Sequence, residues 1–461
     1  MTEQDAPSES PESPAPSRPT DGYLLTERER RLGAHGFYLL LGAAASFGLA
    51  ALLIALGILG AAGDSADLLE LLSSVGANRF EAVTVYGSSA ALLAGILALI
   101  GMGAALILAM AGVLAQEVWS LALVAGSLLV GAIGVVYYGF FPLAIPLAFA
   151  AYAGYRLSRE IHAFRANPVM LKELRERMRG ARAFVVITIY LGLMAGFAVL
   201  LYLIQRADIQ DQGTALTGQL GRDLFAGVVG IEFLLIVFIA PAFTAGAVTA
   251  ERERKTYDLL QITLLPMPSF IVGKLESALS YVFLLLLAAI PLQSIAFLFG
   301  GVSETELILA FIILAVTAVT LGAVGMFFST LVDRTLTASV RAYTVAFIVV
   351  VGVPLVFNFL INIFNNAVVG TGSRVTSSPT LEAALIYLGG LLTSLNPIAT
   401  AITTRELLVD RQTMAFWDAT LSSDGSSIPL VSPWITLVII YLIVSTVLIL
   451  LAVRRLRRME A

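Results

Sequence analysis

Long stretches without Asp, Glu, Lys or Arg follow residue 31, and they limit what this chain can fold into more than any other feature. Three of them, 32–63, 82–116 and 118–155, fill most of the first third of the sequence. A helix that crosses the hydrocarbon core of a bilayer needs about 20 apolar residues. Backbone N–H and C=O groups in lipid must be paired within their own segment, so these runs predict transmembrane helices.

The third run is too long for one crossing. At about 1.5 Å per residue it would measure roughly 57 Å as a single helix. The stretch 137–142, Tyr-Tyr-Gly-Phe-Phe-Pro, is a natural break, and we expect a hairpin of two short spans there. With the later runs, this predicts an all-α polytopic membrane protein of about ten transmembrane helices. The later spans are expected at about 183–205, 224–249, 277–300, 307–331, 342–364 and 434–453.

The composition agrees with a membrane bundle and excludes several kinds of site. The chain is 58% hydrophobic and 13% charged, whereas a soluble domain has about a quarter charged residues. There is no cysteine, so disulfides and thiolate metal sites are excluded, and the two histidines form no ligand cluster. We predict no metal site and no catalytic constellation. The basic residues lie at membrane boundaries, which argues against nucleic-acid binding.

The placement of Lys and Arg orients the predicted spans. Cytoplasmic loops carry an excess of these residues, and ten spans put both termini on one side. If that side is the cytoplasm, as in an inner (cytoplasmic) membrane, all but six of the 28 basic residues lie inside. The six on the outer side are Arg79, Arg206, Arg222, Arg374, Arg405 and Arg411.

One further uncharged run, 383–404, contains Asn396-Pro397. If it crossed fully, the Arg-rich C-terminus would lie outside, so we interpret it as a re-entrant or interfacial helical pair on the outer face.

The first residues are rich in Pro, Ser and Glu and have little to bury, which is typical of disorder. The expected regions are a disordered cytoplasmic tail (1–31), an N-terminal four-helix membrane region (32–155), a cytoplasmic amphipathic elbow (156–182) and a six-helix core (183–461).

The segment 167–180 has the signals of a capped amphipathic helix. Asn167 suits the N-cap and Pro168 the first helical position, while Gly180 suits the C-terminal end. Such a helix can lie in the membrane interface before a span, where it would contact lipid, or it can merely anchor that span. The candidate residues of this elbow helix are Asn167, Pro168, Leu171, Lys172, Glu173, Leu174 and Arg175.

A second charged segment follows the span at 224–249. Glu251–Lys255 and Arg254–Asp258 are opposite charges four residues apart, which supports a solvent-exposed helical turn that ends before Pro266. The segment either docks on a cytoplasmic protein or is a solvated loop. Its candidate residues are Glu251, Arg252, Glu253, Arg254, Lys255, Thr256, Tyr257, Asp258, Leu259 and Leu260.

These motifs together carry a resemblance to a known family. The string from Ala250 to Leu260, followed by Gly273-Lys274-Leu275, resembles type-2 ABC transporter permeases. The segment beginning Asn167-Pro168-Val169 is similar to the interfacial elbow of a subgroup of these permeases. The outer loop of these permeases before the last span is similar to the stretch Ser394-Leu395-Asn396-Pro397. The resemblance covers about 161–461, and the four N-terminal spans depart from the family pattern.

The resemblance implies the membrane subunit of an ATP-driven transporter, usually an exporter. The loop at 251–268 would be a coupling helix seated in a cleft of a cytoplasmic ABC ATPase, and six core spans imply a second permease copy or paralogue. The chain has no G-x-x-x-x-G-K-[ST] phosphate loop, so it is not expected to be an enzyme. We expect no cofactor on this chain, with ATP and magnesium on the partner ATPase.

Glu232 stands out because it lies inside the predicted span 224–249. A carboxylate within a membrane costs a few kcal/mol, so it should face the bundle interior or a water path, as a substrate or proton contact, or lie near the outer interface. Glu276 is expected to snorkel at the inner interface. Two other functions make different predictions. An ion-coupled secondary transporter predicts paired intramembrane carboxylates, and a non-transporting scaffold leaves the charged loop without a nucleotide-dependent partner.

Overall fold

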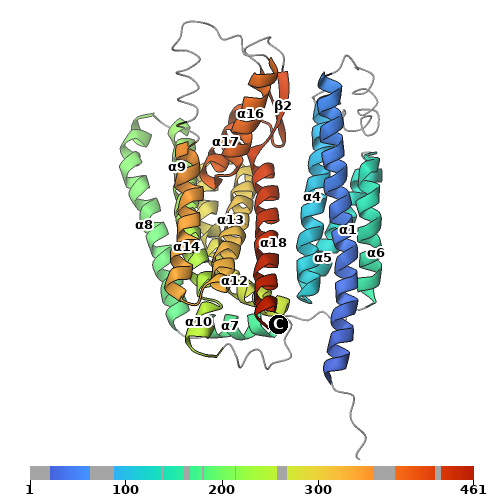
Figure 1. Cartoon of the computed structure of the whole chain (residues 1–461). Coiled ribbons are helices and arrows are strands. Elements are labelled where there is room, and N and C mark those ends of the chain that lie inside the picture. Colours follow the sequence, from blue (N-terminus) through green and yellow to red (C-terminus); the bar gives the residue numbers. More distant parts are fainter. Residues whose placement is uncertain are drawn as a thin grey trace, which may run out of the picture.

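The computed structural model consists of long helices that stand side by side in two bundles (Figure 1). It describes residues 21–62, 88–136, 139–159, 167–178, 181–212, 214–256, 267–356, 359, 379–420 and 427–460. Within these residues nine helices are long and apolar enough to cross a membrane, or ten if one bent pair counts as a span. The predicted all-α polytopic membrane fold is confirmed.

The N-terminal bundle shows the predicted break of the long apolar run. Helix α5 ends at Val136 and a short 3-10 helix begins at Phe141, with Gly139 in the left-handed region at a φ of 72°. The returning helix α6 has 15 residues, about 22 Å, which is shorter than a bilayer core of about 30 Å. The elements are α1 (Asp21–Ala62), α4 (Ser88–Leu114), α5 (Val118–Val136), η1 (Phe141–Leu143) and α6 (Ala144–Ser158).

The second bundle begins with the short helix α7, which lies across the lower end of the long helices in Figure 1. Helix α13 packs against α9, α12, α14 and α18, and thus lies at the centre of this bundle. The helices are α7 (Pro168–Met178), α8 (Ala181–Gln212), α9 (Thr214–Ala245), α10 (Thr249–Glu253), α12 (Met267–Phe299), α13 (Glu304–Leu331), α14 (Thr335–Phe347), with the π-helical turn η3 (Ile348–Gly352), and α18 (Pro433–Glu460).

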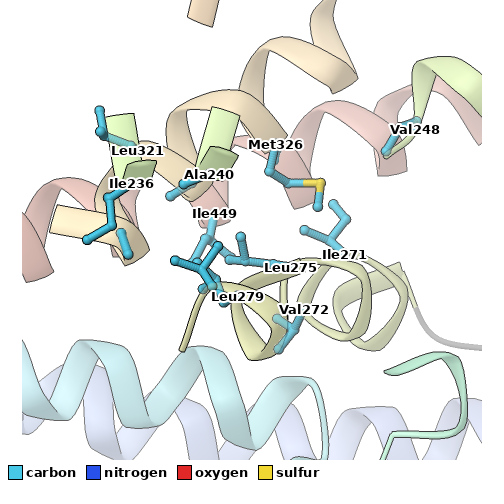
Figure 2. Packing of buried hydrophobic residues seen from close by; sticks show 14 of the residues in the cluster. Ile236, Ala240, Val248, Ile271, Val272, Leu275, Leu279, Leu321, Met326 and Ile449 are labelled. Carbon is cyan, nitrogen blue, oxygen red and sulfur yellow. The ribbon is translucent and has the colours of Figure 1, made fainter. Parts of the chain in front are cut away.

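The core of the second bundle joins α9, α12, α13 and α18 through fully or almost fully buried side chains such as Ile236, Leu279, Leu321 and Ile449 (Figure 2). In lipid, apolar burial does not by itself favour one helix neighbour, so close packing and polar contacts between helices matter more. One such contact joins α13 to α18, where the hydroxyl oxygens of Thr320 and Ser445 lie 2.9 Å apart.

The run around Asn396 forms two helices, α16 (Pro379–Ser394) and α17 (Pro397–Asp410), bent by 115°. Asn396 makes the bend: its Oδ1 accepts from Ala399 N at 2.9 Å, and its Nδ2 donates to two carbonyls of the π-helical turn. The pair lies at the end of the bundle away from α7 and α10 (Figure 1). A bend of this size is found both in re-entrant pairs and in broken spans, so the expected re-entrant or interfacial pair stays a prediction. A hairpin of β1 (Phe416–Thr420) and β2 (Ser427–Val431) then leads into α18.

The two bundles pack against each other along α4 and α18. Leu450 of α18 packs on the core of the N-terminal bundle, and Ala115, just after α4, belongs to the core of the second. Gln116 follows with a φ of 60°, so the chain turns sharply there. Each bundle therefore contributes side chains to the other's core.

Candidate functional site

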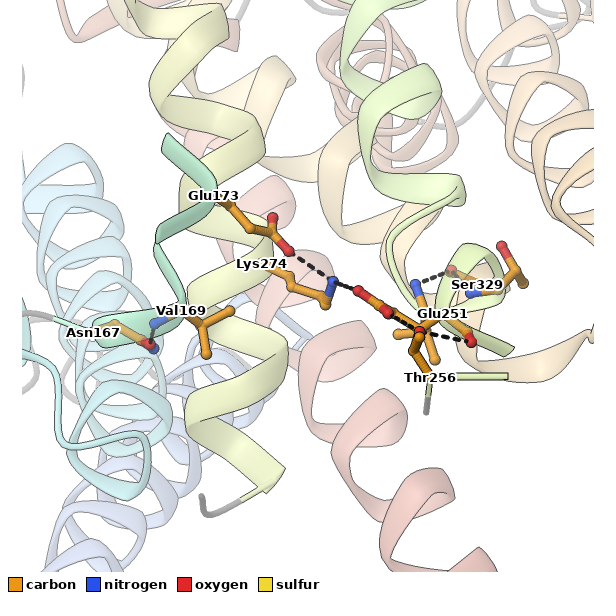
Figure 3. A network of polar contacts seen from close by, with 9 residues as sticks. Asn167, Val169, Glu173, Glu251, Thr256, Lys274 and Ser329 are labelled. Carbon is orange, nitrogen blue, oxygen red and sulfur yellow. Dashed lines mark hydrogen bonds and ion pairs between the residues drawn. The ribbon is translucent and has the colours of Figure 1, made fainter. Parts of the chain in front are cut away.

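Three of the motifs singled out in the sequence, those at Asn167, at Glu251 and at Gly273-Lys274-Leu275, meet at one end of the second bundle, which we call the α7/α10 end (Figures 1 and 3). Helix α7 starts as its sequence predicts. Pro168 is its first residue, and the side chain of Asn167 accepts a hydrogen bond from Val169 N at 3.0 Å, as an N-cap does. Gly180 lies outside the described residues.

Asn167 also fastens α7 to α12. Its Nδ2 donates to the carbonyl oxygen of Ser269 at 2.6 Å, and the side chain is 2% exposed. It lies directly on Gly273, where an added Cβ would come within 2.6 Å of the Asn167 amide carbon. A larger residue at 273 would push the amide away from Ser269. The Asn-Pro and Gly-Lys-Leu motifs are therefore two sides of one contact.

Lys274, the next residue, joins three helices. Its ammonium lies 2.7 Å from Glu173 Oε1 on α7 and 3.1 Å from Glu251 Oε1 on α10 (Figure 3). The lysine is 5% exposed, and the two carboxylates provide the pairing that a buried charge requires. The elbow motif, the charged-loop motif and the start of α12 are thus linked through one cation.

Glu251 makes a different pair from the one we predicted. The expected Glu251–Lys255 contact across a helical turn is wrong, because α10 ends at Glu253 and Lys255 takes a left-handed φ of 57°. The chain turns there, Thr256 N donates to the carbonyl oxygen of Glu251 at 3.0 Å, and the Thr256 hydroxyl bonds the Glu251 carboxylate. Glu251 therefore faces Lys274. Tyr257, Asp258, Leu259 and Leu260 lie outside the described residues.

Arg252 and Glu253 connect α10 to the other side of the bundle. Arg252 Nη1 pairs with Asp333 at 3.2 Å, and Glu253 Oε1 accepts from Thr335 N, the first residue of α14, at 2.7 Å. Ser329 of α13 accepts hydrogen bonds from the two backbone N–H groups that begin α10. A short five-residue helix is thus anchored to α12, α13 and α14, and through Lys274 to α7, while Arg254 and Lys255 stay exposed.

A family model described as an ABC-2 family transporter protein matches residues 168–461, more than half of the chain. The chain belongs to this family. The match starts at the first residue of α7 and includes every helix of the second bundle that meets at the α7/α10 end. The protein is therefore a multi-pass permease, a membrane subunit of an ABC transporter, and the family is one that partners with an ABC ATPase subunit. A comparison with curated proteins gave no match.

The N-terminal bundle, outside the matched region, contacts this permease at the same end. Glu117, between α4 and α5, is 3% exposed, and its Oε1 accepts from Asn167 Nδ2 at 2.6 Å. Burial raises the pKa of Glu117 to about 7, the nearby Glu276 carboxylate adds to this, and the Asn167 hydrogen bond opposes it. In the sequence, Glu117 is a single acid between two long apolar runs. That pattern could have indicated its role at this junction, but the sequence analysis did not single it out.

Glu276 of the permease does not snorkel as expected. Its carboxylate accepts a hydrogen bond from the indole N–H of Trp119 on α5, and its second oxygen is buried. The reason is that α12 starts ten residues before the predicted span, so that Glu276 lies against α5 rather than at a free helix end. Trp119 and Glu117 thus fix the N-terminal bundle to α12 and to the start of α7.

Glu232 faces the permease interior, one of the two placements we considered. It is 1% exposed, and its Oε2 accepts from Gln293 Nε2 on α12 at 2.7 Å. It lies roughly 20 Å along α9 from the C-terminal end of that helix, at about 1.5 Å per residue, and is separate from the α7/α10 end. Among the described residues there is no group of His, Asp and Glu that could hold a metal ion.

Proposed function

We propose that this permease exports a substrate across the inner (cytoplasmic) membrane with energy from ATP that a separate ATPase subunit hydrolyses. The main support is the arrangement of α10. Its outward side exposes Glu253, Arg254 and Lys255, while Glu251 and Arg252 hold it to helices on both sides of the bundle. A helix built this way can receive a displacement from a partner and pass it to the spans.

The ATPase would bind from the cytoplasm. The segments around α7, α10 and the C-terminal end of α18 are rich in Lys and Arg. Because cytoplasmic loops carry an excess of these residues, this supports a cytoplasmic position for the three segments and for both termini. ATP and magnesium would be held by the ATPase, and a second permease copy or a paralogue would complete the transporter. Helix α7 would rest on lipid headgroups, because Leu171 is 43% exposed beside charged neighbours.

Closure of the ATPases on ATP would move α10 as a rigid body. The contacts of Glu251 and Lys274 would carry this motion to α7 and α12, and those of Arg252 and Glu253 to α13 and α14. Packed helices respond to such displacements by shear or hinge motion, which can convert an inward-facing bundle into an outward-facing one.

The test is co-purification of candidate ATPases with the full-length chain carrying Arg254→Glu. This reversal changes an exposed charge whose described electrostatic interaction within the chain is with Glu251, so it should weaken ATPase binding roughly tenfold while the permease still purifies as a single species. Lys172→Glu is the matched control, since Lys172 is an exposed cation on α7 at the same end. Unchanged ATPase binding by both R254E and a Lys255→Glu variant would refute docking at α10.

A further inference from the structure

The turn that joins α4 to α5 is held firmly in shape at the α7/α10 end. Gln116 has a φ of 60°, and Glu117 N donates to the carbonyl oxygen of Gly112 at 2.9 Å. The hydroxyl of Ser120 donates to the carbonyl oxygen of Glu117 at 2.6 Å. Gly112 lies so close to α5 that an added Cβ would come within 2.7 Å of the Trp119 ring. Glu117 and Trp119 therefore extend from a rigid turn.

Both of these side chains end on the permease. Glu117 Oε1 accepts from Asn167 Nδ2 at 2.6 Å, and Trp119 donates its indole N–H to the Glu276 carboxylate. Glu117 is 3% exposed and Asn167 is 2% exposed, so water cannot easily replace their contact. In lipid, apolar surfaces do not by themselves choose a neighbour, so polar contacts of this kind determine how two bundles sit together.

The partners on the permease lie next to the groups that hold α10. Asn167 begins α7, and its Nδ2 also donates to the carbonyl oxygen of Ser269 on α12 at 2.6 Å. Lys274, which pairs with Glu251 of α10 at 3.1 Å, lies two residues before Glu276 on α12. The N-terminal bundle therefore holds the same short stretch of α12 to which α10 is attached.

A displacement of α10 can act on this stretch in two ways. If α7 and the start of α12 are free, the whole α7/α10 end slides as a block and the spans keep their angles. If they are held, the displacement is taken up by a change of angle between packed helices, which is a hinge or shear motion. The N-terminal bundle is suited to hold them, because it also packs on α18 through α4.

We propose that the N-terminal bundle is a fixed support for α7 and the start of α12, with Glu117 and Trp119 as positioning residues, so that a displacement of α10 tilts the spans. This rests on the proposed function for the source of the displacement. The support itself belongs to the chain alone and can be measured without an ATPase. It gives a role to the bundle that lies outside the family match.

The chain has no cysteine, so two introduced cysteines can carry spin labels without background. Ser158→Cys on α6 and Lys172→Cys on α7 are exposed positions, and pulsed electron paramagnetic resonance gives the distance between them in the full-length protein in lipid nanodiscs. The native junction should give a narrow distance distribution. Glu117→Met with Trp119→Phe removes both contacts, and the distribution should broaden roughly twofold because the start of α7 loses its buried link to α5.

Two matched variants separate the junction from general effects. Glu117→Gln keeps an acceptor oxygen for Asn167, so its distribution should stay as narrow as that of the wild type. Trp434→Phe also loses an indole hydrogen bond, to the carbonyl oxygen of Met414 at the other end of the bundle, and should leave the distribution unchanged. If E117M/W119F does not purify as a single species, E117M alone decides, since Asn167 keeps its bond to Ser269 there.

The role in coupling is read with a co-purified ATPase, ATP and orthovanadate. The distance should stay constant in the wild type and shift in E117M/W119F, while both proteins bind the ATPase equally. An equally narrow distribution in E117M/W119F, or a wild-type distance that shifts on addition of ATP and orthovanadate, would overturn the inference. Failure of every candidate ATPase to co-purify would contradict the proposed function, and a broadened E117M/W119F distribution would still support the fixed junction.

Discussion

The ammonium of Lys274 lies 2.7 Å from the carboxylate of Glu173, although 101 residues separate the two along the chain. The same ammonium contacts Glu251, 23 residues before it. Three motifs that the sequence places on separate segments thus share one buried cation. Because a buried charge is tolerated only with good partners, the position of each segment depends on the other two.

Removal of this cation should destabilise the α7/α10 end. Lys274→Met leaves two partly exposed carboxylates without their countercharge. Breaking a fully buried pair costs about 3–5 kcal/mol, and the exposure of Glu173 and Glu251 makes the loss smaller here. Thermal unfolding in detergent should show a clearly lower midpoint. The triple variant E173Q/E251Q/K274M removes all three charges and should recover much of the loss. An unchanged midpoint in K274M would mean that water already screens the three groups.

Gly273→Ala tests the contact between α7 and α12. The added Cβ would meet the Asn167 amide, and such overpacking costs about 1–3 kcal/mol. Asn167→Ala alone should cost about 1 kcal/mol through the lost cap, in addition to the lost hydrogen bonds to Glu117 and Ser269. In the double variant the clash is gone, so its unfolding midpoint should equal that of N167A. Additive losses would show that the two side chains do not meet.

The stability of the junction at Glu117 should depend on pH. Its pKa in the folded protein is about 7, above the ordinary value of 4.5, so the folded state binds more protons between these values. This contribution to stability is complete below about pH 4.5 and is lost as the pH rises through 7. The unfolding midpoint of the wild type should therefore be lower at pH 8 than at pH 6. Glu117→Gln stays neutral and should show a smaller difference, while an identical difference in both proteins would exclude Glu117 as its source.

Glu251→Gln should separate ATPase docking from coupling. Glu251 faces Lys274 rather than the exposed side of α10, so this variant should bind the ATPase as the wild type does. It weakens the link to α7 and α12, and substrate-stimulated ATPase activity should fall while basal ATPase binding persists. Loss of ATPase co-purification in E251Q, to the level of R254E, would place Glu251 in the docking surface instead.

Several elements could be predicted from the sequence because local physics determines them. The uncharged runs have to be helices in lipid, the Tyr-Tyr-Gly-Phe-Phe-Pro stretch ends α5, and Asn167 and Asn396 begin helices where an N-cap residue precedes proline. The same local reasoning predicted the Glu251–Lys255 pair, and that prediction is wrong. The i,i+4 rule holds only where the helix continues, and the helix stops at Glu253.

The sequence by itself determined the membrane class, the helix boundaries near breaks and caps, and the segments that carry the family motifs. Only the tertiary structure decided which groups meet: Lys274 with Glu173 and Glu251, Asn167 with Gly273 and Glu117, and Glu232 with Gln293. The physical reason is range. Helix formation and capping act over a few residues, whereas the partner of a buried polar group is chosen by helix packing across the whole bundle, because any unpaired charge or donor there is costly.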